Sequence, residues 1–224
     1  MTGLEVRHSE FSYLASLESP AFEVLGTGGQ LYAGIYAGLA RFRVKLADIR
    51  LESQSANPAD ISVVCSLLDL GALIRYRLDR VEVWSVSARL AADATLVGLI
   101  EDAVRVVREV SRGARIATHT LSLAIHGMLT EGTIAERLAA YIARTPEATP
   151  PFRAGGVSFS CEWPEGGGES SVVLERSLTV PDGAFVRLTS VHPGRLSERE
   201  SYQRATEFFQ RALAHLDIEL RWRS

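Results

Sequence analysis

A histidine and two hydroxyl side chains in segment 115–126 could carry out nucleophilic chemistry. His126 lies on the same face of the expected strand as Thr120 and Ser122, because side chains alternate between the two faces of a strand. Such a set could serve a hydrolase or a transferase. A serine–histidine nucleophile also needs a buried carboxylate and an oxyanion hole, and the sequence marks neither. This face therefore predicts either the lining of a polar cavity or a surface facing solvent.

Five basic residues on two expected strands form a second candidate site. Alternation places Arg41, Arg43 and Lys45 on one face of one strand, and Arg75 and Arg77 on one face of another. If the two strands are neighbours, the side chains would form one basic surface for phosphate, nucleic acid or an acidic protein. Binding there would weaken steeply with salt. The alternative is solvent-facing charge that is paired with nearby acidic residues.

Other catalytic and cofactor motifs do not occur in the sequence. The Gly-Thr-Gly run 26–28 begins a dinucleotide fingerprint, but Leu31 stands where the third glycine is needed. There is no Walker A loop, G-x-S-x-G elbow, H-E-x-x-H segment or cysteine–histidine cluster. His119 and His126 are predicted on opposite faces of their strand, so they cannot jointly hold a metal. We therefore expect no cofactor and no metal site.

Composition and charge limit the class of protein. The 224 residues are 46% hydrophobic and 23% charged, with a formal net charge of −3, which argues against a dominant polyphosphate partner such as nucleic acid. Cys65 and Cys161 match no zinc or redox spacing, so both are expected to be buried thiols. The sequence shows no signal peptide and no apolar run of the ~18 residues that a membrane span needs. We expect a cytoplasmic protein without membrane contact.

The candidate residues depend on a predicted frame between residues 72 and 127. Hydrophobic periodicity there indicates two strands, a long helix 93–111 capped by Asp93 or Thr95, and a strand 115–126. A shorter version of the same pattern follows after residue 184. It has a strand, a helix 197–216 that begins with a Ser197–Glu200 capping box, and a short strand. Before the frame, residues 1–20 are predicted as a peripheral helix or arm. Residues 22–39 and 40–53 are predicted as strands, the second with Phe42, Val44 and Leu46 facing inward.

We predict an α+β fold with a mostly antiparallel sheet in two pseudo-repeated lobes, backed by two long helices. The N-terminal lobe would span residues 1–144 and include a short helix 133–144, which begins with a Thr133–Glu136 capping box. The C-terminal lobe, 152–224, would hold a three-strand meander and the helix 197–216. The proline-rich linker 145–151 would join them into one compact unit.

Four segments also carry a resemblance. They are LIRYRLDRVEVWSVS through LSLAIHG, the short helix Thr133–Arg144, the strand end CEWPEGGG and the helix segment EFFQRALAHL. Over residues 60–220 their order and spacing resemble a sporadically distributed bacterial family of uncharacterised α+β proteins of similar length. The arginine-tyrosine strand of that family is replaced here by THTLSLAIHG. The resemblance implies no agreed activity and no catalytic residues.

Three functions are compatible with these patterns. The leading hypothesis is a non-enzymatic bacterial protein that binds a protein partner, a small ligand or further copies of itself, the last through a sheet edge or helix face. It rests on the missing catalytic motifs, which also favour a protein that is not an enzyme. One alternative is a hydrolase or transferase that uses His126 with Ser122 or Thr120. The other is a polyanion or nucleic-acid binder that uses the basic strands.

Overall fold

The computed structural model describes residues 1–26, 29–53, 57–86, 94–143, 155–163 and 167–222. The strands in these residues are β1 (Thr2–Leu17), β2 (Ile49–Ser53), β3 (Ile61–Leu67), β4 (Ala72–Tyr76), β5 (Arg80–Val86), β6 (Ile116–Leu129), β7 (Gly156–Glu162), β8 (Glu169–Arg176), β9 (Ala184–Pro193) and β10 (Ile218–Arg221). The α-helices are α1 (Gln30–Gly38), α2 (Ala94–Val110), α3 (Ile134–Ala143) and α4 (Glu198–His215). Short 3-10 helices are η1 (Phe22–Leu25), η2 (Ala40–Phe42), η3 (Leu46–Asp48), η4 (Pro58–Asp60) and η5 (Leu68–Leu70).

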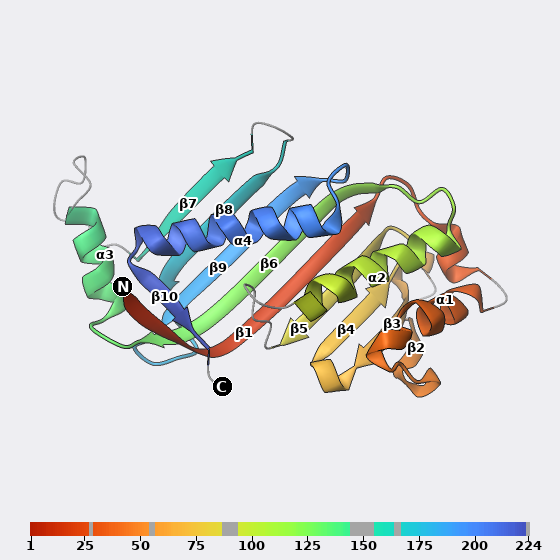
Figure 1. Ribbon diagram of the computed structural model, residues 1–224, viewed down its shortest axis with the longest axis horizontal. Helices are drawn as coiled ribbons and strands as arrows, with labels where there is room; N and C mark the ends of the chain where they lie inside the picture. Colours follow the sequence, from red (N-terminus) through yellow and green to blue (C-terminus); the bar gives the residue numbers. More distant parts are fainter. Residues whose placement is uncertain (27–28, 54–56, 87–93, 144–154, 164–166, 223–224) are drawn as a thin grey trace.

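The strands join into one continuous sheet (Figure 1). Their order is β2-β3-β4-β5-β1-β6-β9-β8-β7, and β10 pairs with the start of β1. That last pair is parallel, whereas the other neighbouring strands are antiparallel. Along the chain a long strand, a helix, a run of strands and a long helix occur twice, first from β1 to α2 and then from β6 to α4. The predicted α+β fold with a mostly antiparallel sheet is confirmed.

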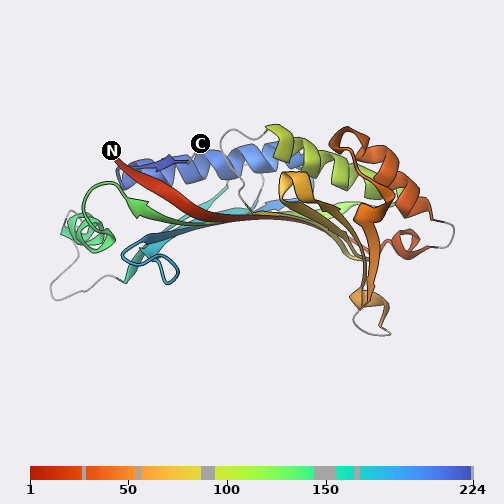
Figure 2. The same ribbon diagram turned by 90° about the horizontal axis from the view of Figure 1, so that it is seen from below.

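The sheet is arched, and α1, α2 and α4 lie on its convex side (Figure 2). Alternate residues of each strand point toward these helices and build the core. In β1 they include Phe11, Tyr13 and Ala15, at most 1% exposed, and burial of such apolar surface is the main driving force of folding. The residues between them, such as Ser12 and Leu14, point to the concave side. No described α-helix lies beneath the arch (Figure 2).

The prediction of a peripheral helix or arm for residues 1–20 is wrong. The segment forms β1, which pairs with β5, β6 and β10 near the middle of the sheet. Phe11, Tyr13 and Ala15 carry the period-two alternation of a strand. A register shift between Val6 and His8 interrupts that alternation, because a bulge adds one unpaired residue and reverses the faces beyond it.

The strand predicted for residues 22–39 is also wrong, because η1 and α1 occupy this segment. Leu31 and Ile35 are buried one helical turn apart. A Cβ at Gly34 would lie 3.1 Å from Val110 Cγ2, and one at Gly38 would lie 2.6 Å from a methyl of Val106. The glycines that looked like one face of a strand are therefore contact points where α1 packs closely on α2.

Residues 40–48 form turns, so only the last part of the predicted strand 40–53 is a strand, β2. Arg43 has a left-handed φ of 57°, which no strand accommodates, and η2 and η3 flank it. Arg41, Arg43 and Lys45 consequently share no strand face. Leu46, predicted to face inward, is 70% exposed, and β2 begins only after η3.

The remaining predicted helices are confirmed to within one residue at each end: 93–111 is α2, 133–144 is α3 and 197–216 is α4. The capping box of α4 is present, since the Ser197 hydroxyl accepts from Glu200 N and the Glu200 carboxylate accepts from Ser197 N. The predicted strand 115–126 is β6, and the meander is β7 to β9. The linker 145–151 and the cap Asp93 lie outside the described residues.

The two cysteines differ in their surroundings. Cys65 is buried, as predicted, whereas Cys161 is only half-buried, and both are free thiols. Burial raises the pKa of the Cys65 thiol to about 12, so it is unreactive near neutral pH. Among the described helices, none combines the length and the apolar character that crossing a bilayer requires.

Candidate functional site

A row of hydroxyl side chains crosses the concave face of the sheet. Its members, each opposite the next on a neighbouring strand, are Ser12 (β1), Ser122 (β6), Thr189 (β9), Ser171 (β8) and Ser160 (β7). We call these five residues the hydroxyl row. Neighbouring strands lie about 4.8 Å apart, so the row is about 19 Å long. The row runs across the strands, and each of the five strands contributes one residue to it.

The hydroxyl row points away from the helices. On β6, for example, Ser122 lies between Leu121 and Leu123, which are both fully buried in the core. Within the described part of the chain, no side-chain hydrogen bond involves any member of the row. Each hydroxyl can donate one hydrogen bond and accept two. The row therefore offers several neutral donors and acceptors to a ligand under the arch.

Trp84 of β5 stands at one end of the hydroxyl row, directly opposite Ser12. Trp84 is 40% exposed, whereas tryptophan residues are on average highly buried. It borders a cavity of about 550 Å³. The cavity is lined by Ser12, Tyr13, Leu14, Leu73, Arg75, Glu82, Val83 and Trp84. An aromatic face beside apolar and cationic side chains can stack on a flat ring.

The arginines nearest Trp84 are largely neutralised. Arg75 lies 3.4 Å from both Glu52 and Glu82, and Arg80 Nε lies 2.6 Å from Glu82 Oε1. Arg77 is 4.0 Å from the same Glu82 oxygen. Hydrogen bonding by the Arg50 side chain, aided by the charges of Arg50 and Arg75, holds the pKa of Glu52 below its ordinary value. This side of the concave face therefore carries little net charge.

Arg187 differs from these arginines. It lies on β9, two residues from Thr189 of the hydroxyl row and so on the same concave face. Its side chain is exposed, and it forms no ion pair with any described residue. It is the concave-face cation best placed to meet an anionic group of a ligand.

The predicted basic surface does not form as one patch. Arg41 lies on the convex side, where Nε is 2.6 Å from Asp102 Oδ2 and Nη2 is 2.7 Å from the carbonyl oxygen of Gly98 on α2. Arg75 and Arg77 alternate with the buried core residue Tyr76, so they point to the other side. The sheet separates the two groups, which sequence alternation alone had merged.

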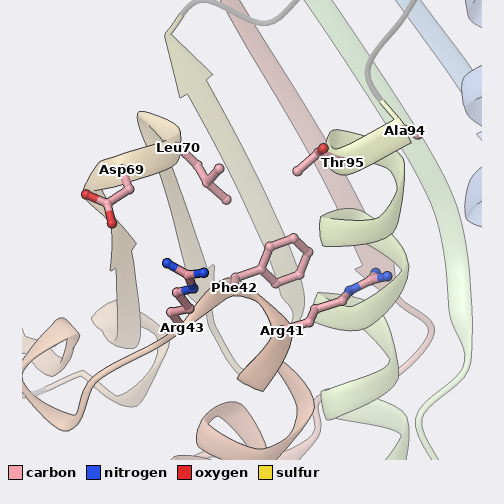
Figure 3. Close-up of a pocket in the computed structure, with 7 residues that line it drawn as sticks. All are labelled: Arg41, Phe42, Arg43, Asp69, Leu70, Ala94 and Thr95. Carbon is pink, nitrogen blue, oxygen red and sulfur yellow. The ribbon is translucent and has the colours of Figure 1, made fainter.

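Arg41 and Arg43 instead border a second cavity, of about 500 Å³, between η2, η5 and the first turn of α2 (Figure 3). Arg43 points toward Asp69 across the opening, while Arg41 turns along α2 (Figure 3). Lys45 is exposed and lies outside this cavity. Because Arg41 is held by Asp102 and Gly98, it serves mainly to fix η2 against α2.

His126 meets a different hydroxyl from the two predicted. Its Nδ1 lies 2.8 Å from Ser177 Oγ, which also accepts from the backbone amides of Thr179 and Val180. The Ser177 hydroxyl therefore donates its proton to His126 Nδ1. Both of its lone pairs accept from backbone amides of the turn, so none is left for another donor. Burial, then the neighbouring His8, lowers the pKa of His126.

The candidates Ser122 and Thr120 share the concave face with His126 but are four and six residues away along β6. At about 3.4 Å per residue, they are about 14 and 20 Å from it, far beyond hydrogen-bond reach. The structure therefore does not bring this set together. His119, on the opposite face of β6, is fully buried in the core. Among the described residues, no group of three or more His, Cys, Asp or Glu side chains is arranged to hold a metal ion.

Comparisons with known proteins give few matches. No family model matches the sequence, and no curated protein matches it either. The fold is similar to the solved structure of a rolling circle replication initiator protein from Geobacillus stearothermophilus, with 10% sequence identity and a TM-score of 0.36. That match covers 92% of this chain and 83% of the other.

The leading hypothesis of a non-enzymatic protein for protein interaction or small-ligand binding does not stand against this finding and is corrected. At this TM-score the likeness transfers no activity to the chain, and any function has to be argued from its own surface.

Sequence reasoning missed Trp84 and four members of the hydroxyl row. Ser122 alone was a candidate, for a different chemistry. The register between Ser12 and Ser122 joins residues 110 positions apart (122 minus 12), which no local pattern reveals. The signal available for Trp84 was strand alternation, which places it on the face opposite to Val83 and Ser85. In the structure Val83 and Ser85 are buried and Trp84 faces outward.

Proposed function

We propose that this protein binds single-stranded nucleic acid on the concave face of its sheet. The observation that carries the proposal is the exposed Trp84 at the end of the hydroxyl row. An aromatic ring on an open sheet can stack on a base of any sequence, a contact worth about 1–3 kcal/mol. The ligand would cross the strands along the row.

The hydroxyl row suits the sugar-phosphate backbone of such a ligand. Serine and threonine hydroxyls are common donors to phosphate oxygens. Small side chains along the row also let a polymer approach the sheet closely. Arg187 adds one charge-assisted contact beside the row, which a phosphate oxygen can accept.

The charge of the face limits the kind of binding. Because Glu52 and Glu82 neutralise the arginines near Trp84, most phosphate contacts would come from neutral hydroxyls. The affinity of single strands falls with log salt with a slope of about −0.7 for each neutralised phosphate. We expect a shallow slope, close to that of a single phosphate, in keeping with the net charge of −3. This replaces the steep dependence expected from a continuous basic surface.

Fluorescence anisotropy with labelled single-stranded DNA and RNA tests the proposal. The wild-type protein is expected to bind, with duplex DNA and inorganic polyphosphate competing weakly because neither offers an unstacked base. Trp84→Ala should weaken binding about tenfold, as loss of one stacked base implies. The matched control is Tyr36→Ala, which removes an aromatic side chain 50% exposed on α1, on the convex side.

Two results would overturn the proposal. One is the absence of binding to either labelled strand at micromolar protein concentration. The other is equal affinity of the wild type and Trp84→Ala. Competition by polyphosphate as strong as by single strands would assign the face to general polyanions and remove the role of stacking.

A further inference from the structure

A carboxylate stands beside the stacking surface of Trp84. Among the described residues that line the cavity beside Trp84, Glu82 is the only acidic one. It lies two residues before Trp84 on β5, so both side chains point to the same face, about 7 Å apart along the strand. Leu14 and Leu73 supply apolar walls. A base that stacks on Trp84 therefore has one of its edges beside Glu82.

The carboxylate of Glu82 keeps hydrogen-bonding capacity for a ligand. Its Oε1 accepts from Arg80 Nε at 2.6 Å, and its Oε2 accepts from Arg75 Nη1 at 3.4 Å. The side chain is 27% exposed. Because an ionised carboxylate offers about four lone-pair sites, each oxygen can accept a further N–H. The two arginines already compensate its charge, so a neutral pair of donors suits these sites better than a cation does.

Arg75 adds a donor next to these two acceptors. It lies directly opposite Glu82 on the neighbouring strand β4, where side chains on one face are in contact. Its terminal nitrogens bond Glu82 and Glu52, each at 3.4 Å. Each of these nitrogens carries a second N–H. A ligand edge that lies over the pair thus meets two acceptors and then a donor, in the order Glu82 Oε1, Glu82 Oε2, Arg75 Nη1.

Guanine is the common base whose edge matches this order. Its Watson–Crick edge carries the 2-amino donor, the N1–H donor and the O6 acceptor side by side. Adenine and cytosine each have a ring acceptor beside their amino group, and thymine and uracil have one donor between two acceptors. Each of these edges would bring an acceptor against the carboxylate, which has no proton to donate.

We propose that the cavity beside Trp84 selects guanine in a single-stranded nucleic acid. Glu82 would accept from N1–H and the 2-amino group, and Arg75 would donate to O6. The inference rests on the proposed function, since it names the base that the stacking surface takes. Trp84 supplies a contact that any base can make, while Glu82 and Arg75 supply the preference. A bidentate contact of this kind provides about tenfold discrimination.

Strands that differ in one base test the selection with the wild-type protein. Fluorescence anisotropy is measured with labelled oligothymidylates that are uniform or carry one central guanine, adenine, cytosine or hypoxanthine. The guanine strand should bind about tenfold more tightly than the uniform, adenine and cytosine strands. Hypoxanthine lacks only the 2-amino group of guanine, so its strand should bind more weakly than the guanine strand.

The outcomes separate this inference from the proposed function. Equal affinity for all strands, or a hypoxanthine strand that binds like the guanine strand, overturns the selection of guanine and leaves the binding of single strands intact. Absence of binding to every strand removes both.

Glu82→Gln tests the residue that carries the selection. The variant keeps the size of the side chain but replaces one acceptor oxygen by an amide donor, so the tenfold ratio of guanine to adenine affinity should be lost. The ratio is the measured quantity, because a change of net charge affects both strands alike. Asp79→Asn is the matched control: its carboxylate also accepts from Arg80, at 2.9 Å, and lies outside the cavity. It should keep the wild-type ratio, and a guanine preference that survives Glu82→Gln contradicts the proposal.

Discussion

His119 Nδ1 lies 2.7 Å from the Tyr13 hydroxyl inside the core, and its Nε2 lies 2.9 Å from the carbonyl oxygen of Leu196. A carbonyl oxygen only accepts, so Nε2 carries the proton and Nδ1 accepts from Tyr13. The pair joins β1 to β6 and to the loop before α4.

Tyr13→Phe should lower the free energy of unfolding by about 1–3 kcal/mol, because it leaves Nδ1 buried without a donor. Urea denaturation at neutral pH measures the change. The control is Tyr36→Phe, since that ring is half exposed on α1 and should unfold like the wild type. A Tyr13→Phe protein as stable as the control would show that the hydrogen bond between Tyr13 and His119 makes no net contribution to the free energy of unfolding.

The pH dependence of stability should contain a contribution from His192. Burial, followed by the charges of Arg204 and His119, lowers its pKa to about 4, whereas a histidine in the unfolded chain has a pKa of about 6.5. Between these values the unfolded chain binds more protons. The stabilisation is therefore complete above about pH 6.5 and declines by up to about 3 kcal/mol as the pH falls to 4. Denaturant titration at pH 7 and pH 4.5 measures the free energy of unfolding that is lost between these values. In His192→Gln this loss should be smaller than in the wild type by most of that amount. A loss equal to that of the wild type would contradict the role of His192.

Two ion pairs connect α2 to α4 and should differ in their contribution to stability. Arg108 Nη2 lies 2.7 Å from Glu198, whose side chain is 7% exposed, whereas Arg199 pairs with Glu101 at the surface. Arg108→Ala leaves a buried carboxylate alone and should cost about 2–3 kcal/mol. Arg199→Ala should cost at most about 1 kcal/mol. Thermal denaturation of both variants should preserve this order, and the reverse order would contradict it.

Two glycines in neighbouring parts of the fold should tolerate alanine very differently. A Cβ at Gly194 would overlap the carbonyl oxygen of Ile116, while one at Gly113 meets nothing within 4 Å. Gly194→Ala must move backbone between β9 and β6 and should cost several kcal/mol, roughly 3 or more. Gly113→Ala should leave the midpoint of urea denaturation nearly unchanged. Comparable stability of both variants would refute the close approach at Gly194.

Arg187 should account for most of the salt dependence of nucleic-acid binding. In Arg187→Ala the slope of log affinity against log salt should become shallower by about 0.7, the value of one phosphate contact. Arg112→Ala, which removes an exposed arginine after α2 on the convex side, should keep the wild-type slope. Anisotropy titrations at several salt concentrations provide both slopes.

Local signals predicted much of the fold. The helices α2, α3 and α4 were found because their apolar spacing and the capping boxes at Thr133 and Ser197 lie within a few residues of one another. Helix α1 was missed, since Gly34 and Gly38 fit a strand face equally well until Val106 and Val110 of α2 are known to lie against them. The packing of α1 on α2 distinguishes the helix from a strand, and the sequence pattern within α1 carries no information about that packing.

The candidate site was harder to predict than the fold. Its members lie on strands whose pairing depends on register across more than 100 residues, as for Ser12 and Ser122. Alternation correctly assigned Ser122 and His126 to one face, but not the distance between them or the turn hydroxyl of Ser177 that His126 contacts. The prediction of one basic surface was wrong for a related reason. The positive φ of Arg43 ends the strand alternation on which that prediction was based.

The parallel pairing of β1 with β10 has a consequence for how the chain folds. Thr2 pairs with Ile218 and Glu5 with Arg221, so contacts that complete β1 come from residues that are synthesised much later than β1 itself. Pairings this distant in sequence close slowly, because chain entropy is lost before the contact forms. While the nascent chain still lacks β10, residues 2–5 have an open backbone edge on that side. The first strand of this sheet is thus expected to be among the last to be fully protected from hydrogen exchange.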